Sequence, residues 1–127
     1  NMEKDFDISG DLEDYAVDSI KSLGLDFLRN VILSTPVDKG TARGNWVVGI
    51  NARDDNIYQF RRDANIAINL GEAYINTIKY SADTVINISN NLPYIVPLNN
   101  GSSKQAPEFF VEIAARNADV NIQNGDL

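Results

Sequence analysis

The sequence predicts an α+β domain in which a small sheet is covered by helices. Three observations support this fold class. Apolar residues recur at steps of three and four before residue 34 and again over residues 63–79, which is the period of an α-helix. Two shorter segments, residues 45–51 and 84–89, alternate in the manner of strands. A short helical pattern follows near the C-terminal end.

One long amphipathic stretch predicts the first helix, which is expected to run from a cap at Ser9 or Asp11 to about Leu33. Its apolar residues form one stripe for burial, made of Leu12, Ala16, Ile20, Leu23, Phe27 and Val31. Residues 1–10 are polar and acidic and are predicted to be a flexible N-terminal segment. A single domain is therefore expected over residues 11–116, which suits a chain of 127 residues.

A turn follows the first helix over residues 35–40. Pro36 cannot continue a helix, Asp38 can accept hydrogen bonds from nearby backbone amides, and Gly40 can take a positive φ. We therefore predict that the chain reverses here and that the only tryptophan, Trp46, begins a strand. A tryptophan at this position is expected to lie in the core.

A polar connection over residues 52–62 precedes the second predicted helix, which covers residues 63–79. Asp63 is well placed at its N-terminal end, where an acidic side chain interacts favourably with the helix dipole. The helix needs an apolar stripe to pack on the sheet. The spacing assigns this stripe to Ile66, Leu70, Ala73 and Ile78.

The strand over residues 84–89 leads into a long loop over residues 90–105, which is rich in Asn, Pro, Gly and Ser. Structureless loops of this length in compact domains are usually functional or disordered. Pro107 then suits the first turn of a short last helix. Residues 117–127 are expected to be a flexible C-terminal tail.

Composition excludes several classes of protein. The chain has no cysteine and no histidine, which excludes disulfides, thiolate nucleophiles, imidazole acid–base catalysis and the usual zinc sites. Its formal net charge of −7 opposes binding to nucleic acid and to anionic membranes. No apolar run approaches the roughly 20 residues of a membrane span. We therefore expect a soluble protein that is made in the cytoplasm.

The remaining routes to catalysis find no support in the sequence. Two acidic clusters, in residues 11–14 and 54–55, lack the ligand spacing of a calcium loop and are interpreted as solvated surface. Nothing in the sequence brings carboxylates such as Asp38 and Glu72 together for hydrolysis. A glycine-rich phosphate loop is also absent. The sequence therefore predicts no enzyme, no cofactor and no metal site.

Two blocks of the sequence match a known pattern. The first is the ungapped run Thr35-Pro36-Val37-Asp38-Lys39-Gly40-Thr41-Ala42-Arg43-Gly44-Asn45-Trp46. The second is Asn91-Leu92-Pro93-Tyr94 followed by Leu98, Asn100-Gly101-Ser102 and Gln105-Ala106-Pro107. Together they resemble the T-P-V-D-x-G-x-x-R-x-(S/N)-W and N-x-P-Y…L-E-x-G…Q-A-P signatures of the bacteriophage tail-completion and neck proteins, which join head to tail. The resemblance covers residues 12 to 115.

This resemblance implies a long first helix packed across a short antiparallel sheet. It implies a structural virion protein of a tailed bacteriophage that forms or completes the head–tail connector, as an oligomeric ring at the junction of neck and tail. Its partners would be further copies of itself, the portal or adaptor protein and tail proteins, while DNA would pass through without specific binding. A tail terminator of the same assembly is the alternative, and a soluble phage-encoded inhibitor or a carboxylate-dependent hydrolase is more distant.

The chain departs from the family pattern at two positions. Asn99 stands where the family usually has an acidic residue, which puts a contact carried by that carboxylate in question. Phe109 stands where the family usually has a glycine after Q-A-P-x. Because this change removes a flexible position and adds an aromatic, we expect the turn into the last helix to differ.

The two blocks supply two sets of candidate site residues. The first set is a structural turn motif made of Pro36, Asp38, Gly40 and Trp46. The second set is a candidate assembly interface made of Arg43, Tyr94, Leu98, Asn99 and Gln105. For Arg43, a contact with a partner and an ion pair with Asp38 are both open. For Tyr94, the open alternatives are an interface with a neighbouring subunit and simple packing.

Overall fold

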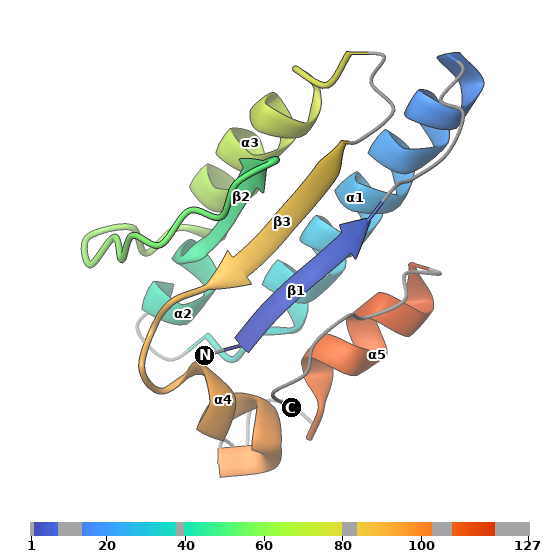
Figure 1. Cartoon of the computed structure of the whole chain (residues 1–127). Coiled ribbons are helices and arrows are strands. Elements are labelled where there is room, and N and C mark those ends of the chain that lie inside the picture. Colours follow the sequence, from blue (N-terminus) through green and yellow to red (C-terminus); the bar gives the residue numbers. More distant parts are fainter. Residues whose placement is uncertain (1, 8–13, 38–39, 80–83, 103–107, 119–127) are drawn as a thin grey trace.

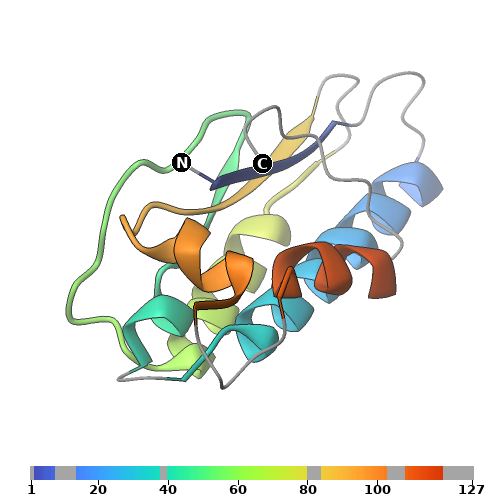
Figure 2. The same ribbon diagram turned by 90° about the horizontal axis from the view of Figure 1, so that it is seen from below.

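The structure is a computed structural model that describes residues 2–7, 14–37, 40–79, 84–102 and 108–118. Within these residues, three strands form one sheet, and a layer of helices covers one of its faces (Figures 1 and 2). The predicted α+β fold class, with its long helix near the N-terminal end, is confirmed. Among the helices described, none is both long enough and apolar enough to cross a membrane.

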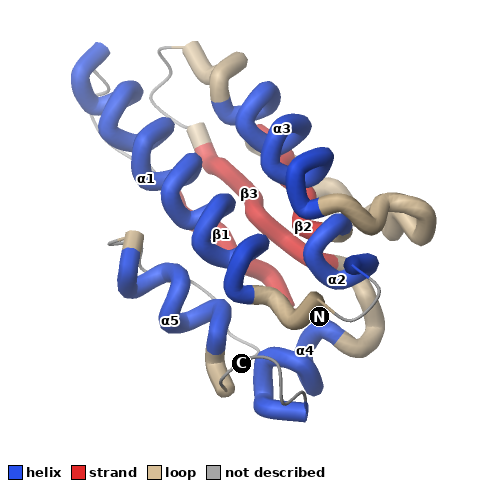
Figure 3. The backbone as a smooth tube through the Cα atoms, turned by 180° about the vertical axis from the view of Figure 1, so that it is seen from behind, coloured by secondary structure: helices blue, strands red, loops and turns tan. Residues whose placement is uncertain are grey.

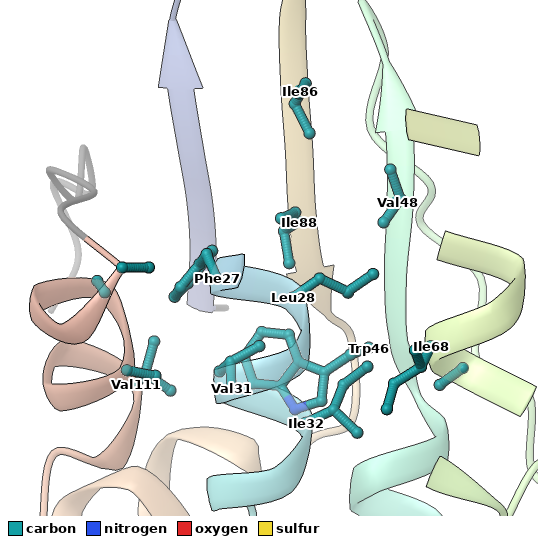
Figure 4. Close-up of a cluster of buried hydrophobic side chains, with 14 of the residues drawn as sticks. Phe27, Leu28, Val31, Ile32, Trp46, Val48, Ile68, Ile86, Ile88 and Val111 are labelled. Atoms are coloured by element: carbon teal, nitrogen blue, oxygen red, sulfur yellow. The ribbon is translucent and has the colours of Figure 1, made fainter. Parts of the chain in front are cut away.

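The sheet has three strands in the order β1-β3-β2, and both outer strands run antiparallel to β3. The strands are β1 (Met2–Asp7), β2 (Trp46–Ile50) and β3 (Val85–Asn90). The register places Val48 of β2 opposite Ile88 of β3. Because opposed residues share a face of the sheet, both side chains point into the core beneath the helices (Figure 4).

Strand β1 corrects the prediction of a flexible segment over residues 1–10. The register pairs Phe6 with Ile86 and Lys4 with Ile88. Without β1, the central strand β3 would present a row of backbone N–H and C=O groups without a partner on that side. The polar and acidic composition of residues 2–7 hid this pairing, because a partner about eighty residues away leaves no local signal.

Three helices lie side by side against the sheet in the order α5, α1, α3 (Figure 3). Their bounds are Asp14–Ser34 for α1, Ala64–Ile75 for α3 and Phe110–Asn117 for α5. The first helix ends close to the predicted Leu33, whereas its two predicted caps lie outside the described residues. Since α1 packs against both neighbours, α3 and α5 occupy opposite edges of the domain.

Short helical turns occupy residues 95–102 of the predicted loop over residues 90–105. They are α4 (Ile95–Pro97) and η2 (Leu98–Ser102), and a further turn, α2 (Thr41–Gly44), precedes β2. Helical turns satisfy backbone polar groups locally where a segment lies against the core. The last helix was expected to start near Pro107, which lies outside the described residues.

The core lies between the helix layer and the sheet, and α1 is at its centre (Figure 4). Trp46 is fully buried there, as predicted. The ten largest side chains with an exposed fraction below 2% come from helices and strands that are far apart in the sequence. They are Trp46, Phe27, Phe110, Leu28, Ile32, Ile75, Ile86, Ile88, Ile95 and Val31.

Helix α3 buries a different face from the predicted one. Of the predicted stripe only Ile78 is buried, beyond the end of the helix, and Ile66, Leu70 and Ala73 are exposed. The buried face consists of Ala67, Ile68, Gly71 and Ile75. Gly71 explains the choice, because a Cβ atom there would lie 2.5 Å from Cδ2 of Leu28. Small residues let α3 approach α1 closely, whereas apolar periodicity alone does not distinguish the two faces.

Candidate functional site

The predicted turn motif joins α1 to β2 through hydrogen bonds from side chains. The indole Nε1 of Trp46 donates to Oγ1 of Thr35 (2.8 Å), and this hydroxyl donates to the carbonyl of Val31 (2.6 Å). Arg43 donates from Nε to the carbonyl of Thr35 (2.7 Å) and from Nη2 to the carbonyl of Leu33 (2.9 Å). The guanidinium therefore caps the C-terminal end of α1, where a cation is favoured by the helix dipole.

Arg43 thus has a role that neither sequence interpretation included. Its two described hydrogen bonds lie within its own chain and give it a structural role in the turn, while its assignment to the assembly interface stays a prediction. Its ion pair with Asp38 stays a prediction, because Asp38 lies outside the described residues. Pro36 is buried directly after α1, in agreement with its predicted role as the end of the helix.

Two glycines of the first sequence block, Gly40 and Gly44, allow α2 to contact the backbone of residues 61–62. Gly40 has a φ of 76°, as its predicted role requires, and a Cβ atom there would collide with the carbonyl oxygen of Arg62. A Cβ atom at Gly44 would collide with the carbonyl oxygen of Arg61. These two contacts fix the distal part of the connection between β2 and α3 against the turn.

Substitution of Gly40 by alanine should lower the free energy of unfolding by more than about 2 kcal/mol, because a side chain disfavours a positive φ and its Cβ atom would also collide with the carbonyl oxygen of Arg62. Chemical denaturation monitored by circular dichroism measures this change. Thr41→Ala, at the next position, is the control and should stay within about 0.5 kcal/mol of the wild type. An unchanged midpoint for Gly40→Ala would contradict the need for glycine here.

The connection between β2 and α3 follows a defined path, although composition suggested only a polar connection. The side chain of Asn45 accepts from the backbone N–H of Tyr58 (2.7 Å) and donates to its carbonyl (3.0 Å). Arg61 donates to the carbonyl of Gly44 (2.7 Å), and its guanidinium lies 4.1 Å from the centre of the Tyr58 ring. This connecting segment, residues 51–62, therefore projects in a fixed geometry from the domain edge beside β2 (Figure 1).

Tyr58 also anchors this segment through its hydroxyl, which donates to Oδ2 of Asp54 (2.9 Å). The pKa of Tyr58 is raised above its usual value, mainly because burial disfavours the charged phenolate. The hydrogen bond to Asp54 and the negative charge of Asp54 raise it further. The backbone carbonyl of Asp54 accepts in turn from Nδ2 of Asn91 (2.8 Å). The second sequence block thus contributes to holding the connecting segment in place.

A contiguous apolar surface lies along the outer side of α3 and the connecting segment. We call it the α3-edge surface, and its side chains, which are 43% to 92% exposed, are Ile57, Phe60, Ile66, Leu70 and Tyr74. Ile57, Phe60 and Ile66 line one hollow of about 590 Å³. Leu70 and Tyr74 continue the row along the helix at steps of four residues. Phe60 is the most exposed of the set, at 92%.

Sequence reasoning missed this surface, although one signal was present. Helix α3 has a single charged residue, Glu72, among its twelve, whereas a helix on the surface of a monomer usually has a polar face. The carboxylate of Glu72 accepts from Nε of Arg29 in α1 (2.6 Å). It therefore lies toward α1, so the exposed residues of α3 are uncharged and include the apolar row of Ile66, Leu70 and Tyr74 beside the polar Asn65 and Asn69.

The later part of the second sequence block, residues 98–102, lies beside the N-terminal end of α5. Asn99 is fully buried there and serves as a structural cap. Its Oδ1 accepts from the N–H of Val111 (3.0 Å), its Nδ2 donates to Oε1 of Glu112 (2.8 Å), and its carbonyl accepts from the N–H of Phe109 (2.6 Å). This burial corrects the prediction that Asn99 belongs to an assembly interface, because a side chain without exposed surface cannot contact a partner.

The other candidates of that block differ in exposure. Tyr94 is 44% exposed, whereas Leu98 is partly buried against the core. Gln105 lies outside the described residues, so its assignment stays a prediction. Phe109 was noted only as a departure from the family pattern. It is 49% exposed and has a left-handed backbone, with a φ of 57° and a ψ of 40°, which costs a residue other than glycine roughly 1–2 kcal/mol.

Among the described residues, no group of three or more acidic side chains is placed to hold a metal ion. Comparisons with protein-family models, with curated proteins and with solved structures found no match. The assignment of this chain to the phage neck proteins, which rests on the two sequence blocks, therefore stays a prediction. The α3-edge surface is the candidate functional site that the fold presents.

Proposed function

We propose that this chain is a structural virion protein of a tailed bacteriophage. In this proposal, copies of the chain associate through the α3-edge surface and form or complete the connector ring between head and tail. The observation that carries the proposal is Phe60, an aromatic side chain that is 92% exposed within a contiguous apolar surface. The two sequence blocks resemble tail-completion and neck proteins, and this resemblance is the reason for proposing a head–tail connector as the assembly.

Burial of the α3-edge surface would provide a driving force for association. Transfer of one phenylalanine side chain from water to an apolar interface is worth about 2 kcal/mol, and Phe60 has neighbours of the same kind. Exposed apolar patches of this sort mark interaction sites. Aromatic side chains, such as those of Phe60 and Tyr74, are also enriched at the cores of interfaces.

The geometry of the surface favours a binding role because it is held in place before any partner arrives. The connecting segment is fixed by the side chains of Asn45 and Arg61 and by the contact of Gly44 with the backbone of Arg61. A partner would therefore need to order few residues, which lowers the entropic cost of binding.

The proposed partners are further copies of this chain in the ring, the portal or adaptor protein on one side and tail proteins on the other. The proposed location is the virion, at the junction of neck and tail. DNA would pass through the ring without specific binding, because the net charge is −7. Two of the arginines that could bind the phosphate groups of DNA have partners within the chain. Arg53 contacts Asp55 (3.2 Å), and Arg61 donates a hydrogen bond to the carbonyl of Gly44.

A tail terminator of the same assembly is the second candidate, because an apolar surface that joins copies in a ring would serve that role equally. We propose no enzymatic activity. The more distant possibilities, a soluble phage-encoded inhibitor and a carboxylate-dependent hydrolase, receive no support from any described group of residues.

Substitution of Phe60 by aspartate should weaken self-association by at least about tenfold, because it removes the most exposed apolar side chain and places a charge in the interface. Analytical ultracentrifugation over a range of protein concentrations measures this effect, and negative-stain electron microscopy shows whether rings form. Phe60 makes little contact with its own domain, so the thermal stability should stay unchanged.

Val37→Asp is the matched control, because Val37 is a 50% exposed apolar residue outside the α3-edge surface. This variant should associate as the wild type does. Association of Phe60→Asp at wild-type strength would overturn the assignment of the surface. A wild-type chain that stays monomeric at every concentration and with every candidate virion partner would overturn the proposed function itself.

A further inference from the structure

Strand β2 is an edge strand of the sheet, because β3 is the one strand that pairs with it among the residues described. In an antiparallel pair, the backbone groups of successive residues point alternately toward the partner strand and away from it. Directly beyond the ladder, the N–H of Asn51 donates to the carbonyl of Val85 (2.8 Å). The register therefore turns the N–H and C=O groups of Val47 and Gly49 toward β3 and those of Val48 toward the outer edge.

The backbone of Val48 faces this edge without a hydrogen-bond partner in the described part of the chain. The residue is nevertheless only 4% exposed, and most buried backbone groups in folded proteins are paired. The hydrogen bonds that fix the connecting segment against β2 are made at the beginning of the strand, through Asn45 and the carbonyl of Gly44. They leave the middle of the strand edge for another hydrogen-bonding group.

A slot of about 100 Å³ lies beside this edge, where β2, α3 and the connecting segment come together (Figure 1). Its lining includes Val48 of β2, Asp54, Tyr58 and Arg61 of the connecting segment, and Leu70 and Tyr74 of α3. Tyr58 and Arg61 also line the apolar hollow of the α3-edge surface, so the slot and the hollow adjoin. A helix, which is about 10 Å across with its side chains, does not fit into such a slot. An extended backbone is thinner.

The charged groups that line the slot balance one another. Arg61 donates through Nε to Gly44, and no described residue accepts from its two terminal nitrogens. Asp54 accepts from Asn56 at Oδ1 (2.8 and 2.9 Å) and from the hydroxyl of Tyr58 at Oδ2 (2.9 Å). The slot thus keeps N–H donors but carries one charge of each sign. It favours a ligand that offers carbonyl oxygens and has no net charge.

We infer that an extended, uncharged peptide segment of another protein adds to the outer edge of β2. One residue of that segment exchanges two backbone hydrogen bonds with Val48, as opposed residues of a sheet do, and a carbonyl of the segment accepts from Arg61. An apolar side chain nearby enters the hollow of Ile57, Phe60 and Ile66. In strand addition of this kind, the backbone bonds provide affinity and the side-chain pockets provide specificity.

The chemistry of the slot also separates this partner from a second copy of the chain. The other edge strand of the sheet, β1, is charged at four of its six positions, which are Glu3, Lys4, Asp5 and Asp7. Such a strand does not match a neutral slot beside an apolar hollow. The inference goes beyond the proposed ring, because it names a contact with a different protein. Leu70 and Tyr74 belong to both the slot and the α3-edge surface, so the segment and a copy of the chain compete for these two side chains.

Amide hydrogen exchange followed by NMR tests the pairing on the isotope-labelled chain, at a concentration at which it is monomeric. In the free protein, the amide of Val48 should exchange faster than those of Val47 and Gly49, which are bonded to β3. The probe is a short blocked peptide in which valine and threonine alternate. When nine-tenths of the protein is bound, exchange at Val48 should slow about tenfold, because only the free fraction exchanges there.

The same peptide with proline at its central position is the matched control, since proline has no N–H to donate to Val48. It should leave exchange at Val48 unchanged. On the side of the protein, Leu70→Asp places a carboxylate at the slot and should weaken peptide binding at least about fivefold. Ala73→Asp, at an exposed position of the same helix that lines neither the slot nor the hollow, should bind as the wild type does. Circular dichroism checks that both variants fold.

The possible results decide between occupants. Absence of binding up to the solubility limit of the peptide, or binding that leaves exchange at Val48 unchanged, would overturn the inference. Equal binding of the proline peptide would assign the hollow to apolar ligands without strand pairing. Slow exchange at Val48 in the self-associated chain without peptide would show that a copy occupies the edge, and the assignment to another protein would fail. A chain that never associates would end the proposed function but would leave this inference intact.

Discussion

Replacement of Trp46 by alanine should lower the free energy of unfolding by about 4 kcal/mol, because the indole is fully buried and its removal leaves a large cavity. The substitution also removes the hydrogen bond from Nε1 to Thr35. Urea denaturation followed by circular dichroism measures the effect, since the variant has no tryptophan for fluorescence. Trp46 lies at the junction of α1, α2 and β2, so its loss affects the turn as well as the core.

Two control variants separate the contributions to this loss. Trp46→Phe keeps an aromatic ring but removes the indole N–H, so it should cost less than Trp46→Ala, with about 1 kcal/mol attributable to the hydrogen bond. Phe60→Ala removes an aromatic side chain that is exposed to solvent and should change stability by less than about 0.5 kcal/mol. A loss of under 1 kcal/mol for Trp46→Ala would contradict the central position assigned to the indole.

The turn motif was predictable from sequence to the extent that its chemistry is local. Proline after a helix and glycine at a positive φ act through their own backbone, and both Pro36 and Gly40 lie as predicted. Arg43 and Asn45 act on groups elsewhere in the fold, namely the end of α1 and the backbone of Tyr58. Such roles become visible only when the tertiary structure brings the groups together.

The α3-edge surface could not be predicted from apolar periodicity, because the side of α3 that is buried depends on tertiary packing. Helix α3 is apolar on two sides, and the pattern of Ile66 and Leu70 fits a buried stripe as well as the pattern of Ile68 and Ile75 does. The packing of Gly71 against Leu28 decides which side is buried. The apolar row of Ile66, Leu70 and Tyr74 stays exposed after folding, although the sequence pattern alone assigned Ile66 and Leu70 to the core.

Asn99 stands where the family pattern has an acidic residue, and restoring an acidic residue there should strongly destabilise this chain. Substitution of Asn99 by aspartate should lower the free energy of unfolding by about 3 kcal/mol at pH 7, because it places a carboxylate without exposed surface beside that of Glu112. Oδ1 would still accept from the N–H of Val111. The other oxygen, however, would replace the amide that now donates to Glu112.

This loss should depend on pH with a definite sign. Burial beside a second carboxylate raises the pKa of the introduced carboxyl above its value in the unfolded chain. Its protonated form is therefore favoured in the folded state, so the deficit relative to the wild type should be smallest near pH 4 and should grow as the pH rises. Denaturation of Asn99→Asp and of the wild type between pH 4 and pH 8 measures this difference.

Glu112→Gln, introduced together with Asn99→Asp, tests whether repulsion between the two carboxylates causes the loss of stability. A glutamine amide can donate to the introduced carboxylate, so the double variant should recover most of the lost stability, whereas Glu112→Gln alone should have a small effect. Such non-additivity is expected only of side chains in direct contact. A deficit that Glu112→Gln leaves unchanged would mean that desolvation of one charge, rather than repulsion between two, excludes an acidic residue from position 99 of this chain.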